Sequence, residues 1–334
     1  MLLASIYTSI NEFSKNFVDL EPNNLAKARG SRKWLVEKIE EFPINDESFP
    51  RIYTANNDVQ MGSFSRRTKI RPIDDIDFII VLNAEGTTYS TSIFDGKISM
   101  HVPEAATRLK ALINDDDTLN SVKLLNKLKS SLKDVPQYDQ ADIKRNKEAI
   151  TLKLKTYTWN FDIVPAFLTK PESDGRSYYV IPDGYGNWKK TDPRVDAAKA
   201  TSINQKREGE VLRYVRLIKY WHRRPIMPNV GSYLLENLVL NYFESNDVSA
   251  TEQSTLRDIF LYLSTNIYYS CPDPKGIQGD LNTLDQDTKN KFATAASLAH
   301  SYAKNAIDYT LNDNDQAAHN EWRNVFGGDF PEYE

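Results

Sequence analysis

Residues 61–82 read MGSFSRRTKIRPIDDIDFIIVL, and this stretch decides the fold. Its second half has the period of a β-strand, in which successive side chains point to opposite faces. Asp75 and Asp77 therefore share one face, and Ile76 and Phe78 share the other. Both faces become apolar after Asp77, which is typical of a central strand that enters a core. Because neighbouring carboxylates repel each other and resist burial, we expect them at the start of the strand, where cations can neutralise them.

The acids and the turn before them indicate phosphoryl transfer. Carboxylates at this spacing suit two Mg²⁺ ions about 4 Å apart, which stabilise the attacking and leaving oxygens of an in-line displacement. Gly62 lets the backbone approach a phosphate closely, and the Ser63 hydroxyl and nearby N–H groups can donate to its oxygens. The alternative is a Gly-Ser turn before an edge strand with solvated acids. A third acid on a neighbouring strand would favour the metal site.

Residues 159–167, WNFDIVPAF, supply such an acid. Asp162 is the only acid in this apolar run, where a lone carboxylate is costly unless it is paired or binds a metal. A salt bridge to Arg or Lys is the structural alternative. With Asp75 and Asp77 upstream, a third metal-binding carboxylate is the better interpretation. Asp162 is also the candidate general base, because the four histidines are scattered and lack a recognisable catalytic spacing.

The composition narrows the class of protein. The chain has 334 residues and a formal net charge of −4, so its overall charge gives no footprint for nonspecific nucleic-acid binding. Cys271 is the only cysteine, which excludes a disulfide framework and a multi-cysteine zinc site. No run of about 18 apolar residues exists, so the sequence predicts no membrane span. Residues 1–13 are too short and too polar for a signal peptide, and we expect a cytoplasmic protein.

The remaining pattern predicts an α+β chain. Residues 1–42 have helical periodicity, whereas residues 149–157 and 159–167 alternate as strands. We interpret residues 133–147 and 170–192 as loops. The second of these is rich in glycine and aromatic residues, which either stack on bases or close a core.

From Asp192 onward the pattern is helical, with Asp-Pro as a strong helix start. Residues 211–224, VLRYVRLIKYWHRR, place four cations on one helical face: Arg213, Arg216, Lys219 and Arg223. Such a stripe is usually solvated, but the opposite face here is apolar, and we expect the basic face to look into a cleft. Lys219 is the candidate for triphosphate contact. Ser232 is expected to cap the next helix, residues 231–243.

These motifs resemble those of a known family. Gly-Ser, about a dozen residues and then Asp-x-Asp on a strand resemble the signature of the polymerase β-like nucleotidyltransferases. The runs DIVPAF, RLIKYW and SYLLE resemble the group that contains 2′-5′ oligoadenylate synthase, cyclic GMP-AMP synthase and the bacterial CD-NTases. The later runs CPDP and WRNVFGGDFP resemble the end of the bacterial CD-NTases. The resemblance covers nearly the whole chain.

The resemblance implies an α+β fold with a nucleotidyltransferase palm, a mixed central sheet, a long N-terminal helix and a C-terminal helical lobe. We expect the catalytic core in residues 1–190 and the helical lobe in residues 191–334, with the active site in the cleft between them. Asp75, Asp77 and Asp162 would hold two Mg²⁺ ions, with Mn²⁺ as an alternative.

The resemblance also implies a nucleotide site. Lys219 and Ser232 would hold the triphosphate together with Gly62 and Ser63, and Tyr233 would stack on a base. Gln60, at the edge of the Gly-Ser turn, is a further candidate for donor contact.

The implied function is synthesis of a cyclic di- or trinucleotide second messenger from NTPs, with ATP expected among them. A downstream effector in anti-phage defence and a regulatory protein are the expected partners. Activation by duplex DNA is not expected, because the chain has one cysteine and a net negative charge. The alternatives are a linear oligoadenylate synthase, an enzyme that adds nucleotides to RNA or protein, and a non-catalytic nucleotide sensor. The sequence leaves base selectivity, ring size and linkage open.

Overall fold

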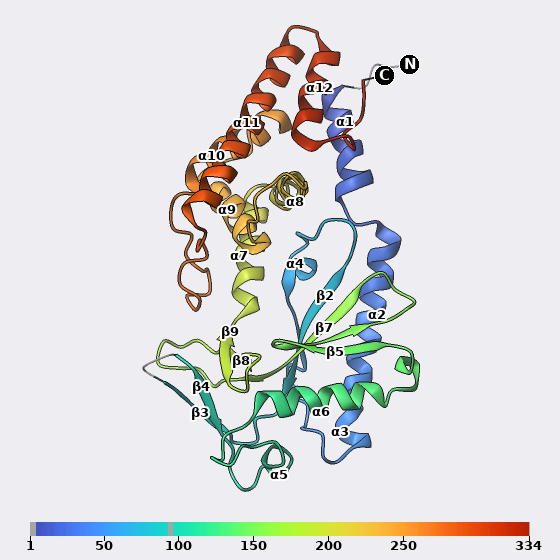
Figure 1. Cartoon of the computed structure of the whole chain (residues 1–334), viewed down its shortest axis with the longest axis vertical. Helices are drawn as coiled ribbons and strands as arrows, with labels where there is room; N and C mark the ends of the chain where they lie inside the picture. The colour runs from blue at the N-terminus through green and yellow to red at the C-terminus, as the bar shows by residue number, and fades with distance from the viewer. Residues whose placement is uncertain (1–4, 93–95, 334) are drawn as a thin grey trace. The chain divides into compact units, whose positions relative to one another are not determined.

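The computed structural model describes residues 5–92 and 96–333, which form two compact units (Figure 1). The sheet unit comprises Pro22–Ser65 and Ile73–Val195. The helical unit comprises Met1–Glu21, Arg66–Pro72 and Asp196–Glu334. The start of the chain therefore packs with its last helices. The predicted functional boundary near residue 190 stays a prediction.

The sheet unit holds, within the described residues, one mixed sheet of nine strands (Figure 1). The strands are β1 (Asp58–Gln60), β2 (Asp75–Leu82), β3 (Thr88–Thr91), β4 (Ile98–His101), β5 (Asp142–Asn146), β6 (Ala149–Lys153), β7 (Asn160–Leu168), β8 (Tyr179–Pro182) and β9 (Trp188–Thr191). Their order is β1-β2-β7-β8-β9-β4-β3, and β6 joins the β5–β6 hairpin to β7. The parallel pair β2 and β7 forms the centre, and the other pairs are antiparallel. The predicted mixed central sheet is confirmed.

Among its described residues, the sheet unit has six helical segments: α2 (Pro22–Glu40), α3 (Phe42–Asn45), α4 (Gly62–Ser65), α5 (Thr107–Lys110), α6 (Ser121–Lys133) and the 3₁₀ turn η2 (Pro136–Tyr138). Helix α6 begins where the Asn120 side chain accepts a hydrogen bond from the Lys123 N–H, as an N-cap does. Helices α2 and α6 pack against the strands. On the α2 side, the Arg32 guanidinium lies 5.0 Å from the centroid of the Phe78 ring.

The two faces of β2 follow the predicted alternation. Ile76, Phe78 and Ile80 are buried on the side where α2 packs. On the other face, Ile79 and Val81 join a second buried cluster beyond the acids. The strand is therefore apolar on both faces after Asp77, as expected, and its two charged side chains, Asp75 and Asp77, lie at its start.

The helical unit contains α1 (Ile6–Phe13), the π-helical turn η1 (Ser14–Val18), most of α7 (Pro193–Lys206), α8 (Val211–His222), α9 (Ser232–Ser245), α10 (Glu252–Asn266), α11 (Gln286–Leu311) and α12 (Asp315–Phe326). A stripe of small side chains lets α11 pack closely against α10 and α12: Ala293, Ala296, Ala299, Ala303 and Ala306. Large rings, among them Phe13, Trp221 and Trp322, fill the rest of this core.

The predicted long N-terminal helical region is confirmed within the described residues, as α1, η1, α2 and α3, with extended backbone at Asp19 between η1 and α2. Other sequence predictions about local structure are wrong. Residues 133–147 and 170–192 are not only loops, since they contain β5 and the β8–β9 pair. These strands are short or strongly charged, so their apolar alternation is weak. Ser232 is the first residue of α9 rather than its cap, which is Gly231.

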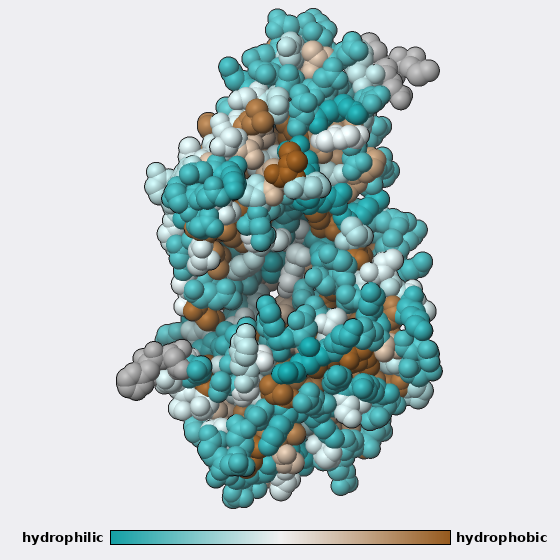
Figure 2. Space-filling view, viewed as in Figure 1, coloured by the Kyte–Doolittle hydropathy of each residue, from teal (hydrophilic) through white to brown (hydrophobic). Residues whose placement is uncertain are grey.

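The visible surface is mainly hydrophilic, with apolar side chains in small separate groups (Figure 2). Hydrophobic residues make up 40% of the sequence, and many of them are buried in the cores of the two units. Among the helices of the described ranges, none is both long and apolar enough to cross a membrane.

Candidate active site

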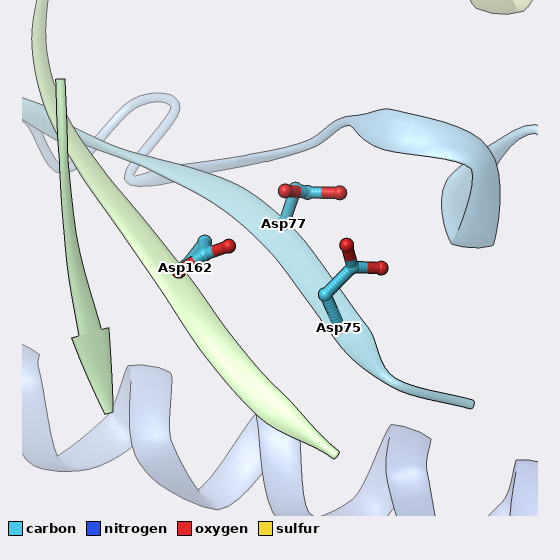
Figure 3. A group of neighbouring side chains, drawn as sticks. All are labelled: Asp75, Asp77 and Asp162. Carbon is cyan, nitrogen blue, oxygen red and sulfur yellow. The ribbon is translucent and has the colours of Figure 1, made fainter. Parts of the chain in front are cut away.

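Three aspartates meet at the start of the two central strands. Asp75 and Asp77 lie on β2, and Asp162 lies on β7 (Figure 3). The parallel register pairs Asp77 directly with Asp162. One carboxylate oxygen from each of the three lies within 4.8 Å of the others, and all three residues are half-buried. The sheet thus brings together acids that are 85 residues apart in sequence, counted from Asp77 to Asp162.

This donor set fits a divalent metal. Carboxylate oxygens are the ligands that Mg²⁺ and Mn²⁺ prefer, and a set of three leaves other positions for water and phosphate. Three like charges this close also repel one another, and a bound cation would neutralise them. The chemistry of the site therefore matches the predicted metal centre.

Asp162 is held by a neighbour that the sequence analysis missed. The Thr151 hydroxyl on β6 donates a hydrogen bond to Asp162 Oδ1, at 2.5 Å. The two residues are direct partners in the antiparallel β6–β7 ladder. The signal was present in the sequence, because Thr151 is a polar residue between Ile150 and Leu152 in an alternating strand. Thr151 fixes which way the third carboxylate points.

Gly62 touches the acids more closely than any other residue type could. Its φ is +73°, and a Cβ built on it would lie 2.0 Å from Asp77 Oδ2. The Met61 N–H donates to the Asp77 carbonyl at 3.3 Å, which holds the turn beside the strand. Ser63 follows directly in α4. The predicted Gly-Ser turn therefore lies against the predicted acids, and it needs glycine for the close approach.

Gln60 is the exposed last residue of β1, and its predicted donor contact stays a prediction. In the antiparallel β1–β2 ladder it pairs with Phe78, whose side chain points toward α2. Directly opposite residues in a sheet share a face, so the Gln60 side chain points away from Asp77.

Lys219, in the helical unit, is part of a buried ion network. Its Nζ lies 2.6 Å from Glu236 Oε2 and donates to the Thr68 carbonyl at 3.2 Å. Arg66 Nε donates to Glu236 Oε1 at 2.5 Å. Lys219 is 6% exposed and Glu236 is 1% exposed. One carboxylate shared by two cations leaves this network with a net positive charge.

The pKa values of this network follow from burial and pairing. Burial alone would raise the pKa of Glu236, but the charges of Lys219 and Arg66 hold it at about 2. Burial lowers the pKa of Lys219, and Glu236 opposes that shift. Glu236 is thus ionised at neutral pH and holds both cations.

The rest of the basic stripe on α8 does not look into a cleft as predicted. Arg216 Nε lies 2.6 Å from Asp19 Oδ1, and Arg213 Nη2 donates to Asn11 Oδ1 at 2.6 Å. Arg223 donates to the Arg71 carbonyl at 2.6 Å. The stripe therefore binds the N-terminal segment and residues 66–72 within the helical unit. Helical spacing shows that the cations share a face but not which distant segment covers it.

Ser232 and Tyr233 begin α9. Ser232 is exposed in the first turn of this helix, where backbone N–H groups lack intrahelical partners. The Tyr233 hydroxyl donates to Asp196 Oδ1 at 2.5 Å and accepts from Lys275 Nζ at 2.5 Å. Burial and Asp196 raise the pKa of this phenol. The hydroxyl is thus hydrogen-bonded to Asp196 and Lys275 within the helical unit. The half-buried ring is the part of Tyr233 that could contact a ligand.

Lys275 and Asp273 are further buried groups that the sequence analysis did not assign. Lys275 is 4% exposed and lies 2.8 Å from Asp273 Oδ1 and 3.3 Å from Asp196 Oδ2. Its Nζ also lies 4.4 Å from the Tyr233 ring centroid. The only signal for these residues was the run CPDPKG, residues 271–276. They fix the orientation of the Tyr233 ring.

Comparisons with known proteins agree with this fold. No protein-family model matches the chain. A probable cyclic nucleotide synthase from Bacillus cereus (strain VD146) is 48% identical over 327 residues, 98% of this chain and 98% of that protein. The CdnC:HORMA-deltaN complex of E. coli MS115-1 is similar with a TM-score of 0.71 and 17% identity, over 97% of this chain and 98% of that chain.

A second solved structure is similar as well. Vibrio cholerae DncV, in complex with the linear intermediate 5′ pppA(3′,5′)pG, has a TM-score of 0.68 and 11% identity, over 99% of this chain and 98% of that chain. At these identities the two structures establish the fold, and the Bacillus relative establishes the family. The chain thus belongs to the bacterial CD-NTases, a family of polymerase β-like nucleotidyltransferases.

Proposed function

We propose that the chain synthesises a cyclic oligonucleotide from NTPs by two-metal phosphoryl transfer. The observation that carries the proposal is the meeting of Asp75, Asp77 and Asp162 beside the Gly62 turn. It is supported by the Bacillus relative named as a probable cyclic nucleotide synthase. Two Mg²⁺ ions, or Mn²⁺, held by the three acids would neutralise charge on the attacking and leaving oxygens.

The residues of the sheet unit would act as follows. Asp162, oriented by Thr151, holds the ribose hydroxyl of the acceptor nucleotide and accepts its proton. The hydroxyl oxygen attacks the α-phosphorus of the donor, the bond from that phosphorus to the bridging oxygen breaks, and pyrophosphate leaves. A second transfer of the same kind closes the ring. Gly62 and Ser63 would contact the donor triphosphate.

The residues of the helical unit would contribute to nucleotide binding. Lys219 belongs to a network with a net positive charge, which favours a polyanion nearby. Ser232 presents its hydroxyl at a helix N-terminus, where anions are stabilised. The Tyr233 ring would stack on a base. These three assignments rest on the family resemblance, and Gln60, at the edge of the Gly62 turn, is a further candidate for donor contact.

The biological proposal follows from the family. The product would be a cyclic di- or trinucleotide, with ATP among the substrates, made in the cytoplasm as a signal for a downstream effector in anti-phage defence. A regulatory protein is a reasonable partner, since CdnC is similar and forms a complex with a HORMA protein. Activation by duplex DNA is not proposed.

The test is an incubation of the protein with four α-labelled NTPs and Mg²⁺ or Mn²⁺, followed by phosphatase and a 3′-5′-specific nuclease. The proposal expects a phosphatase-resistant product that Asp77→Asn does not form. Phosphatase-sensitive short chains would instead indicate a linear synthase, and a ladder on added RNA would indicate a tailing enzyme. No product under any metal, NTP mixture or added nucleic acid would favour the nucleotide sensor.

A further inference from the structure

The β5–β6 hairpin extends the acid-bearing face of the sheet beyond Asp162. Strand register aligns two rows of side chains across β2, β7, β6 and β5. The first row is Asp77, Asp162, Thr151 and Lys144, and the second is Asp75, Asn160, Lys153 and Asp142. Residues directly opposite each other point to the same face. The hydrogen bond from Thr151 to Asp162 confirms that face for the hairpin.

Two lysines therefore share a face with the catalytic acids. Lys153 is exposed and makes no ion pair with any residue in the described part of the chain. Lys144 is 71% exposed and pairs with Asp142 at 2.6 Å. Lys153 stands two strand spacings, about 10 Å, from Asp75, and its flexible four-carbon stem spans much of that gap. Its ammonium can thus reach a phosphate that lies beside the acids.

The order of the strands says which phosphate this is. The Gly62–Ser63 turn flanks β2 on its β1 side, whereas the hairpin flanks β7 on the opposite side. With the donor triphosphate at Gly62, the acceptor hydroxyl lies at Asp162, and the rest of the acceptor lies toward β6. The first transfer releases pyrophosphate from the donor only. The acceptor keeps its own 5′-triphosphate, a polyanion that needs cations outside the donor site.

We propose that Lys153, assisted by Lys144, binds the 5′-triphosphate of the acceptor nucleotide. The inference rests on the proposed function and adds the location of the acceptor's phosphates. Lys153 is the main contact, because Lys144 is already paired with Asp142. Asp142 also stands opposite Lys153 in the ladder, where its negative charge competes with the phosphates. Asp142 thus limits how tightly the acceptor binds.

The test separates the acceptor from the donor chemically. A 2′,3′-dideoxy NTP, labelled at its α-phosphate, serves as a donor that has no hydroxyl to act as acceptor. The acceptor is either an NTP or the matching nucleoside monophosphate, and label transfer gives KM and kcat for each. Lys153→Gln should raise the KM of the triphosphate acceptor roughly tenfold, the loss expected for one charge-assisted hydrogen bond. The KM of the monophosphate acceptor and both kcat values should change less than about twofold.

Two further variants sharpen the result. Arg145→Gln removes an exposed cation from the same hairpin but on the opposite face, since Arg145 pairs with the buried Ile150. It should leave the preference for a triphosphate acceptor unchanged. Asp142→Asn should lower the KM of the triphosphate acceptor, because it removes a competing carboxylate.

An unchanged preference in Lys153→Gln, or an equal loss in Arg145→Gln, would overturn the inference while leaving the proposed function intact. A wild-type protein that transfers no label from any donor would overturn the proposed function itself, and this inference with it. Because the three side chains are exposed, an unchanged unfolding temperature shows that the variants are folded.

Discussion

The acids of the sheet unit and the ion network of the helical unit differ in charge: the first groups three like charges, and the second groups opposite charges. Asp75, Asp77 and Asp162 gather three like charges at half-buried positions. Lys219 and Glu236 gather opposite charges in a buried network that also contains Arg66. Like charges at close range require a cation from outside, so the first cluster predicts a ligand. Opposite charges neutralise each other, so the loss of one partner from the second cluster should mainly destabilise the fold, and any effect on ligand binding comes after that.

The largest effect on stability should come from breaking the ion network. Glu236→Gln leaves Lys219 and Arg66 as buried cations without their carboxylate, and we expect a loss of about 3–5 kcal/mol in the free energy of unfolding. Chemical denaturation measures this loss. The control is Glu244→Gln on the same helix, whose side chain is 50% exposed and which should change the free energy by less than about 0.5 kcal/mol. Equal effects of the two variants would remove the contrast between the clusters.

The same network should make the protein sensitive to acid. The folded state lowers the pKa of Glu236 from 4.5 to about 2, so the folded protein binds fewer protons than the unfolded chain between these values. The stabilisation is therefore complete above about pH 4.5 and is lost as the pH falls toward 2. Glu236→Gln should flatten this part of the stability–pH curve. A variant curve parallel to that of the wild type would mean that another group causes the acid sensitivity.

A smaller effect, on activity, should follow from filling the space at the Gly-Ser turn. Gly62→Ala places a methyl group 2.0 Å from Asp77 Oδ2, so the carboxylate must move. A misplacement of a catalytic group by about 1 Å costs roughly 10²-fold in kcat, and we expect a loss of that order. The matched control is Gly186→Ala, which has the same kind of positive φ but no heavy atom within 4 Å of the new methyl group. If both variants lose equal activity, backbone strain and not the contact with Asp77 is responsible.

The smallest effect should come from Thr151→Val. The substitution keeps the shape of the side chain but removes the hydroxyl that orients Asp162. Partners of metal ligands typically contribute 10- to 100-fold, and we expect a fall of about tenfold in kcat with weaker apparent Mg²⁺ affinity. Magnesium titrations of the reaction rate measure both. Thr91→Val, an exposed strand position on β3, serves as the control. An unchanged magnesium dependence would limit Thr151 to a structural role.

The sequence predicted the acid cluster because its signal is local. The period-two alternation around Asp75 and Asp77 assigns both the strand and the face, and the apolar run around Asp162 marks a carboxylate that needs a partner. In the structure, the parallel β2–β7 ladder then pairs Asp77 directly with Asp162. The helical C-terminal region was predictable for the same reason, whereas the mixed sheet was implied by the family resemblance.

The ion network and the covered basic stripe were not predictable in the same way. Arg216 contacts Asp19, 197 positions away, and Lys219 contacts Thr68, 151 positions away. Helical periodicity identifies a shared face, but the segment that packs on it depends on the tertiary fold. Strand β5 was missed because only Ile143 in it is buried, so its polarity resembles that of a loop. Register, and not distance along the chain, also decides which face a side chain takes, and it pairs Gln60 with Phe78.

The central claim is that the acid cluster, and not acidity at this position in general, carries the reaction. Two adjacent residues test it. Asp75 begins β2 and belongs to the cluster, whereas Asp74 precedes the strand and is exposed. The measurement is the initial rate of pyrophosphate release from NTPs with Mg²⁺ for Asp75→Asn and Asp74→Asn.

We expect Asp75→Asn to slow release roughly 10³-fold, because several kcal/mol of charge stabilisation is lost, and Asp74→Asn to stay within about threefold of the wild type. Unfolding temperatures close to that of the wild type would show that both variants are folded. A severe loss in Asp74→Asn with near-normal activity in Asp75→Asn would contradict the strand register and, with it, the assignment of the metal site.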